Sequence, residues 1–157
     1  MTSVDMNAIW DTDRTITARM QAQKVANTRP EVALRRLLHR RGLRFRLHRP
    51  VPGMPRRTID IAFVRERVAV FVDGCFWHAC PKCYKRPKTN SAFWEKKRED
   101  NMARDRRVAN QLRSRGWKVI RIWEHALRKS PRTCVSRILR GLSLDSPQSV
   151  IRSRVQL

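Results

Sequence analysis

The sequence predicts an α/β domain in which a mixed sheet is flanked by helices and carries a metal-held loop. Hydrophobic residues make up 41% of the 157-residue chain, which is enough for a core and excludes a fully disordered protein. Apolar periodicity changes along the chain in the order helix, strand, hairpin, long helix, strand, helix. Residues 74–90 break this order, because they contain three cysteines and no periodicity.

The first predicted element is a helix from Thr28 to Gly42. Thr28 is a suitable N-cap, Pro30 fits the first turn, and Glu31 stands three residues after the cap. Alternating apolar and basic residues predict a strand over 43–47, and the prolines of 50–55 predict a rigid loop after it.

Two strands follow, over 58–63 and 68–72, and the short segment between them predicts a hairpin. A long charged helix is expected over 91–115, then a strand over 117–123 and a last helix that begins at Ser130-Pro131. The expected inner face of the long helix comprises Phe93, Trp94, Met102, Val108, Ala109 and Leu112.

The chain divides into a central domain over 28–142 and two polar ends. Residues 1–27 are predicted to form an arm with some helix that gains order on a partner such as DNA, and residues 143–157 a flexible tail. No run of eighteen apolar residues and no secretory signal is visible, so we expect no membrane association and a cytoplasmic location.

The net charge of +23 predicts a polyanionic partner. Basic residues interleaved with aromatic ones favour a nucleic acid, whose counterions are released on binding. A solubilising shell is the alternative interpretation. Charge alone distinguishes neither DNA from RNA nor an enzyme from a binding module.

Acidic residues are few in this chain, and two of them are candidate metal ligands. Asp60 interrupts a predicted strand, where aspartate is disfavoured, and Asp73 ends the neighbouring hairpin strand. Together they could hold Mg²⁺, which phosphodiester cleavage uses to activate water and stabilise the leaving oxygen. The alternatives are an ion pair of Asp60 with Arg57 or Arg67, and a turn acid at Asp73.

Cys75, Cys80 and Cys83 lie within nine residues and predict a structural zinc site. The fourth ligand remains open between His125, Cys134, His78 and the other histidines, although Cys134 fits a small core residue better. A disulfide with spare thiols is the alternative, and a reducing compartment disfavours it.

Several segments resemble the very short patch repair (Vsr-type) DNA mismatch endonucleases. They are residues 72–78 (VDGCFWH), 93–94 (FW), 101–106 (NMARDR) and 116–124 (GWKVIRIWE). The similarity spans about residues 19–142. It implies a restriction-endonuclease-like fold, a structural zinc, and Mg²⁺-dependent nicking of one strand 5′ to the thymine of a T·G mismatch. Such mismatches arise by deamination of 5-methylcytosine, which implies a functional link to a cytosine-5 DNA methyltransferase.

The resemblance also assigns catalytic roles by position. Asp60 corresponds to the metal-binding aspartate of the family, and His78 to the histidine that assists proton transfer. Glu31 and Asp105 correspond to acids that support this histidine. Some members have Thr-His where this chain has Val72-Asp73. A backbone carbonyl is a metal ligand there, so Val72 could serve through its C=O and Asp73 as an additional ligand.

Zinc and DNA contacts are implied in the same way. The zinc positions are Cys75, Cys80, Cys83 and His125, with cysteine and histidine exchanged at Cys80 and His125 relative to some members. Phe76, Trp77 and Trp94 correspond to aromatics that wedge into the base stack beside the mismatch. Stacked bases recover about 1–3 kcal/mol each, and a mismatched step opens more easily. A core position is the alternative for these aromatics and for Phe93.

The leading hypothesis is therefore a monomeric, zinc-containing, Mg²⁺-dependent endodeoxyribonuclease that acts on double-stranded DNA with a T·G mismatch. A zinc-knuckle DNA-binding module without catalysis would use the same charge, aromatics and thiols, but it would have no use for Asp60. A related restriction endonuclease that cuts both strands of an unmismatched site is the third hypothesis.

Overall fold

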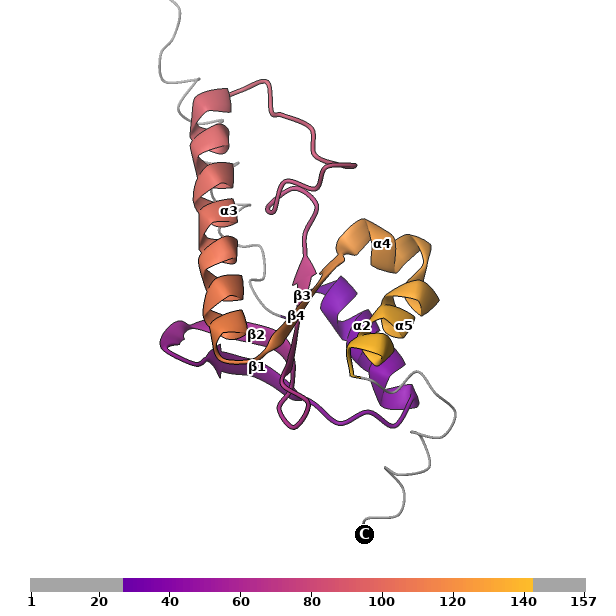
Figure 1. Ribbon diagram of the computed structural model, residues 1–157. Helices are drawn as coiled ribbons and strands as arrows, with labels where there is room; N and C mark the ends of the chain where they lie inside the picture. The colour runs from indigo at the N-terminus through magenta and orange to yellow at the C-terminus, as the bar shows by residue number, and fades with distance from the viewer. Residues whose placement is uncertain (1–26, 143–157) are drawn as a thin grey trace, which may run out of the picture.

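A computed structural model describes residues 27–142, and the predicted arm and tail lie almost entirely outside this range, in residues 1–26 and 143–157. Figure 1 shows the fold. The elements are α2 (Arg29–Arg40), β1 (Arg46–Val51), β2 (Met54–Phe63), β3 (Val68–Asp73), α3 (Ser91–Ser114), β4 (Lys118–Trp123), α4 (Glu124–Lys129) and α5 (Pro131–Gly141).

The four strands form one mixed sheet, as the sequence predicted, and their order in the sheet is β1-β2-β3-β4. β1, β2 and β3 pair antiparallel, and β2 and β3 form the expected hairpin, in which Phe63 lies opposite Val68. β4 pairs parallel to β3, because α3 carries the chain back across one face of the sheet.

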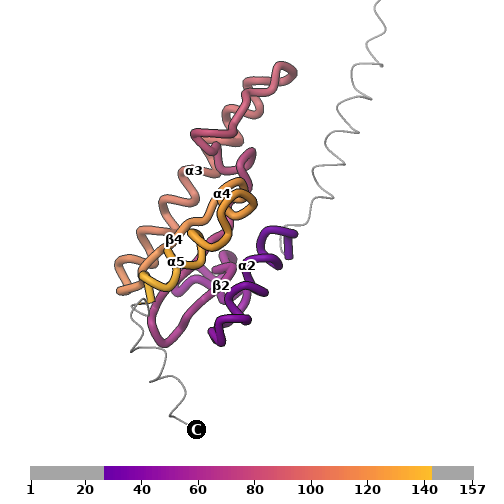
Figure 2. The backbone as a smooth tube through the Cα atoms, turned by 90° about the vertical axis from the view of Figure 1, so that its right-hand side faces the viewer, coloured from indigo at the N-terminus to yellow at the C-terminus, as the bar shows by residue number. Residues whose placement is uncertain are grey.

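Helices cover both faces of this sheet. On one face α2, α4 and α5 bury a cluster that includes Leu38, Ile61 and Ile138, and Figure 2 views the molecule from this side. On the other face α3 buries a second cluster around Ala62 and Leu112. Ile61 and Ala62 are neighbours on β2 and contribute to opposite cores, as the alternation of a strand requires.

The start of α2 agrees with the sequence prediction. The Thr28 hydroxyl accepts a hydrogen bond from the Glu31 amide (3.5 Å), and the helix ends before Gly42, whose φ is +72°. The Glu31 carboxylate in turn accepts from the Asn27 amide (3.0 Å) and from the Thr28 hydroxyl (3.0 Å). This reciprocal arrangement resembles a capping box.

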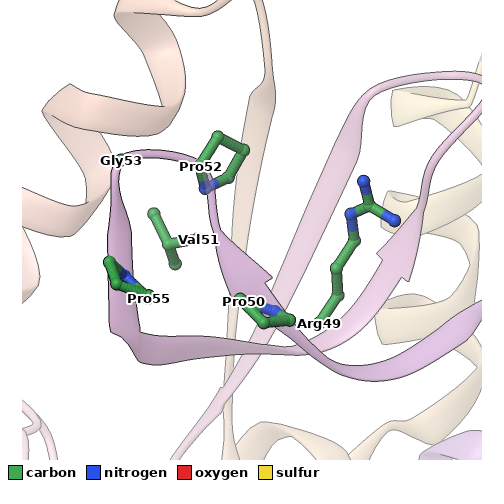
Figure 3. A pocket seen from close by; sticks show the side chains of 6 residues that line it. All are labelled: Arg49, Pro50, Val51, Pro52, Gly53 and Pro55. Atoms are coloured by element: carbon green, nitrogen blue, oxygen red, sulfur yellow. The ribbon is translucent and has the colours of Figure 1, made fainter.

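The prediction for residues 43–55 was wrong in detail. The strand is β1 (Arg46–Val51) rather than residues 43–47. The proline segment forms the tight end of a β1–β2 hairpin instead of a separate loop. Pro50 pairs opposite Thr58. Because β1 is an edge strand, a proline without an N–H is tolerated there. The hairpin tip borders an open hollow, shown in Figure 3, that is lined by Arg49, Pro50, Val51, Pro52, Gly53 and Pro55.

The inner face predicted for α3 was only half correct. Val108, Ala109 and Leu112 are buried against the sheet, but the side chains of Phe93 and Met102 are 54% and 37% exposed. In both views α3 extends beyond the sheet, and its N-terminal half lies beside the 74–90 loop instead of a strand. The helical pattern alone did not reveal where the sheet ends. The short helix α4 was not predicted either.

Candidate functional site

Asp60 lies where β2 and β3 separate. The last pair of the ladder toward the end of β3 is Ile61–Val70, and beyond it the Val72 amide donates to Oδ2 of Asp60 (2.8 Å). Within residues 27–142 no ion pair involves this carboxylate, so it does not pair with Arg57 or Arg67. A carboxylate in the opening between two strands is available to a ligand from outside.

The surroundings raise the pKa of Asp60 to about 6. Burial is the largest cause, and the negative charges of Glu31 and Asp73 add to it. The hydrogen bond from Val72 and the nearby His78 act in the opposite direction. A cation at this position would favour the charged form, so the electrostatics suit a metal ligand.

Asp73 has a different environment from Asp60, although the sequence suggested the same role for both. Its side chain is 2–3% exposed and faces the guanidinium of Arg121. Nε of Arg121 donates to Oδ2 (2.5 Å) and Nη2 donates to Oδ1 (2.6 Å). Both carboxylate oxygens therefore already have a charged partner from β4.

His78 lies in the loop after β3 and meets α3. Its Nδ1 lies 2.5 Å from Oδ2 of Asp105 and 3.9 Å from Oδ1 of Asp73. Burial alone would raise the pKa of Asp105, but the hydrogen bond with His78 and the charges of His78, Arg121 and Arg104 outweigh it and lower that pKa. Asp105 thus stays ionised and fixes one nitrogen of the imidazole, which leaves Nε2 for another partner.

Glu31 is buried at the start of α2, where it completes the helix cap and also raises the pKa of Asp60. Nη2 of Arg35 donates to Oε2 of Glu31 (3.0 Å), and the same nitrogen lies 3.1 Å from Nε2 of His48. Glu31 can therefore both cap α2 and contribute its charge to the site near Asp60. No hydrogen bond or ion pair joins Glu31 to His78 in the described part of the chain.

The three cysteines of the 74–90 loop converge with a histidine of α4. One ligand atom from each of Cys75, Cys80, Cys83 and His125 lies within 4.8 Å of the others. Nδ1 of His125 is 3.2 Å from Sγ of Cys75 and 3.4 Å from Sγ of Cys80. Three thiols and an imidazole are a donor set compatible with zinc. The described cysteines are all free thiols, and Cys134 packs in the core, as expected.

The aromatic residues of the loop and of α3 form a cluster outside both cores. Phe76 contacts Trp77 and Trp94, with ring centroids 5.3 and 5.5 Å apart, and the two tryptophans lie 6.1 Å apart. All three are partly exposed. The exposed Phe93 extends the cluster from Trp94 (5.1 Å). The buried Asn101 of α3 supports this cluster by donating to the Trp77 carbonyl (3.0 Å).

Comparison with known proteins identifies the family. The family model described as DNA mismatch endonuclease Vsr matches residues 9–85. The type II nicking enzyme V.XorIIP of Xanthomonas oryzae is 45% identical over 108 residues, which are 67% of this chain and 76% of that protein. The DNA mismatch endonuclease Vsr of Escherichia coli is 39% identical over 112 residues, 69% of each chain. The chain belongs to the Vsr family.

A further relative is the type II nicking enzyme V.NaeI of Lentzea aerocolonigenes, 45% identical over 109 residues. The aligned region covers 68% of this chain and 65% of V.NaeI. These relatives confirm the predicted class of enzyme, an endodeoxyribonuclease. The mixed sheet with its flanking helices is consistent with the nuclease fold expected for it. No helix within the described residues is long and apolar enough to cross a bilayer.

The structure of this Vsr-family protein also adds residues that sequence reasoning missed. Arg121 joins Asp73 to Asp105, and Arg35 holds Glu31. A signal for Arg121 was present, because it interrupts an apolar strand just as Asp60 does. No comparable signal marks Arg35, which is one of many arginines on an amphipathic helix.

Proposed function

We propose that this Vsr-family protein nicks one strand of duplex DNA on the 5′ side of the thymine in a T·G mismatch. The proposal rests on a contrast between Asp60 and the other acids that are not fully exposed at the site. Glu31, Asp73 and Asp105 are partly or fully buried, and each has a basic partner in Arg35, Arg121 or His78.

Asp60 is the exception. Among the described acids, only Asp60, Glu66, Glu99 and Asp100 have no ion pair, and the other three are exposed. Asp60 is partly buried and has no cationic partner among the described residues, although the protein is rich in basic residues. This supports the role of Asp60 as a metal ligand.

Asp60 and the carbonyl of Val72 would hold Mg²⁺. The ion, when bound, neutralises charge on the phosphodiester and activates the attacking water. Asp73 is the less suitable ligand, because it would first have to release Arg121.

His78 is proposed to transfer the proton. Its Nδ1 is engaged by Asp105, so Nε2 is the atom that would accept a proton from water or donate one to the leaving oxygen. Asp105 orients the imidazole. Glu31 would act at longer range, through its charge beside Asp60.

The aromatic cluster is proposed to select the mismatch. Phe76, Trp77 and Trp94 are partly exposed on a loop and a helix that extend beyond the sheet. Insertion of such side chains separates neighbouring bases at a cost of a few kcal/mol, which is smallest at a mismatched step. The name of one relative, a DNA mismatch endonuclease, agrees with this specificity, and that of another, a nicking enzyme, agrees with cleavage of one strand.

Zinc is proposed to bind Cys75, Cys80, Cys83 and His125. It would fasten the 74–90 loop to α4 and so hold both the aromatic cluster and His78. The substrate further implies repair of deaminated 5-methylcytosine and a functional link to a cytosine-5 methyltransferase. We also propose that the protein acts as a monomer in the cytoplasm.

The test is strand-specific nicking of three duplexes that carry T·G, T·A or C·G at one position, with and without Mg²⁺. We expect nicking of the thymine strand of the T·G duplex only, and only with Mg²⁺. Asp60→Ala should bind the duplex and fail to nick it. Cleavage of both strands of the T·A or C·G duplex would favour the restriction-endonuclease hypothesis, and nicking by Asp60→Ala would contradict the assigned metal ligand.

A further inference from the structure

A single arginine connects the acidic residues around His78. Arg121 lies in the middle of β4, between the buried Ile120 and Ile122. Besides its two bonds to Asp73, it donates from Nη2 to Oδ2 of Asp105 (2.9 Å). One cation from β4 thus holds two carboxylates, one at the end of β3 and one on α3.

Both carboxylates are close to His78, so the position of Arg121 affects the imidazole. Oδ2 of Asp105 is shared between Nη2 of Arg121 and Nδ1 of His78 (2.5 Å), which fixes the carboxylate from two sides. Asp73 lies 3.9 Å from the same nitrogen. Without Arg121, a deeply buried and unpaired carboxylate would lie beside both His78 and Asp60, which is strongly unfavourable.

Arg121 is itself held in place. Its guanidinium carbon lies 5.6 Å from the centre of the Phe71 ring, and Phe71 is its register partner on β3. Arg137 donates to the Arg121 carbonyl (3.1 Å). The planar guanidinium has little freedom to move, because it packs over an aromatic ring and donates through two nitrogens to one carboxylate.

We infer that Arg121 is a positioning residue of the nuclease site, which keeps Asp73 paired and holds Asp105 against His78. The inference rests on the proposed function, since it assumes that His78 transfers the proton. It does not depend on the identity of the mismatch. In this arrangement Asp73 and Arg121 form one unit, and the imidazole presents Nε2 to the substrate in a fixed orientation.

The test compares Arg121→Ala and Arg121→Lys with Arg128→Ala in the full-length protein. Arg128 is an exposed arginine on α4 whose one ion pair within residues 27–142 is with Glu124, so its loss removes the same charge elsewhere. We expect Arg121→Ala to lower kcat about 10- to 100-fold with KM for the duplex changed less than about threefold. Arg121→Lys should recover part of kcat, and Arg128→Ala should leave kcat unchanged.

A double variant keeps the inference testable if Arg121→Ala fails to fold. Asp73→Asn combined with Arg121→Met removes both charges, so no buried ion remains unpaired. We expect it to fold and to lower kcat about 10- to 100-fold relative to the wild type, with KM changed less than about threefold, because Asp105 then lacks the guanidinium that holds it against His78. An unchanged kcat would overturn the inference, and a higher KM with unchanged kcat would overturn it and assign Arg121 to DNA binding.

A spectroscopic measurement separates this inference from the proposed function. The imidazole N–H proton of His78, bonded to Asp105, should give a downfield NMR resonance in the wild type and in Arg128→Ala, and a weaker one in Arg121→Ala. This measurement needs no substrate. An unchanged resonance in Arg121→Ala would refute the positioning role, whereas a wild type that fails to nick the T·G duplex would refute the proposed function alone.

Discussion

Replacement of Asp60 by asparagine should stabilise the protein while it abolishes nicking. The carboxylate is held next to Glu31 and Asp73, and its pKa is raised from 3.8 to about 6. A difference of this size corresponds to about 3 kcal/mol of destabilisation once the group is ionised. Asparagine can still accept the hydrogen bond from the Val72 amide, so most of this energy should be recovered.

The sign of the effect depends on pH in a defined way. Well below pH 3.8 the carboxyl is protonated in the folded and the unfolded chain, and no charge penalty exists. As the pH rises from 3.8 through about 6, the unfolded chain ionises first, so the native state loses stability relative to it. Above about pH 7 the full penalty applies, and the difference between variant and wild type should be largest there.

Thermal unfolding at pH 5 and pH 8, without added divalent metal and without chelator, measures this difference. We expect Asp60→Asn to be about 2 kcal/mol more stable at pH 8, a rise in Tm of roughly 4–8 °C, with a smaller rise at pH 5. Mg²⁺ should raise the Tm of the wild type but not that of the variant. Asp100→Asn, an exposed acid on α3, is the matched control. An unchanged or lower Tm for Asp60→Asn at pH 8 would refute the reasoning.

Three further variants test other parts of the structure. Cys83→Ser should reduce zinc below one ion per chain and lower Tm, whereas Cys134→Ala, in the core, should keep one zinc by atomic emission spectroscopy. Trp77→Ala should reduce the ratio of kcat/KM between T·G and T·A duplexes about tenfold, and an unchanged ratio would exclude it from mismatch selection. Gly53→Ala should cost about 1 kcal/mol or more in unfolding titrations, because φ is +80° and a Cβ would lie 2.4 Å from Nε2 of Gln111. Gln111→Ala should relieve part of that cost.

Local patterns predicted the fold where an element is decided by its own residues. The Thr28 cap, the β2–β3 hairpin and the strand β4 follow from capping, alternation and turn signals, and they were found nearly where expected. The errors arose where the outcome depends on distant segments. Phe93 is exposed because α3 is longer than the sheet it covers, and no feature of the helix itself records the length of the sheet.

The candidate site was predictable in its acids and unpredictable in their partners. By strand pattern alone, Asp60 and Asp73 are both candidate metal ligands, since both stand at strand positions of one hairpin, and only the family resemblance favours Asp60. Their difference arises from β4, which pairs parallel to β3 and brings Arg121 opposite Phe71. Phe71 and Asp73 share one face of β3, so Arg121 reaches Asp73 along that face, while no ion pair within the described residues involves Asp60 on β2. A long-range strand register therefore decides which of the 36 basic residues of the chain pairs with Asp73, and it leaves Asp60 without an ion pair within residues 27–142.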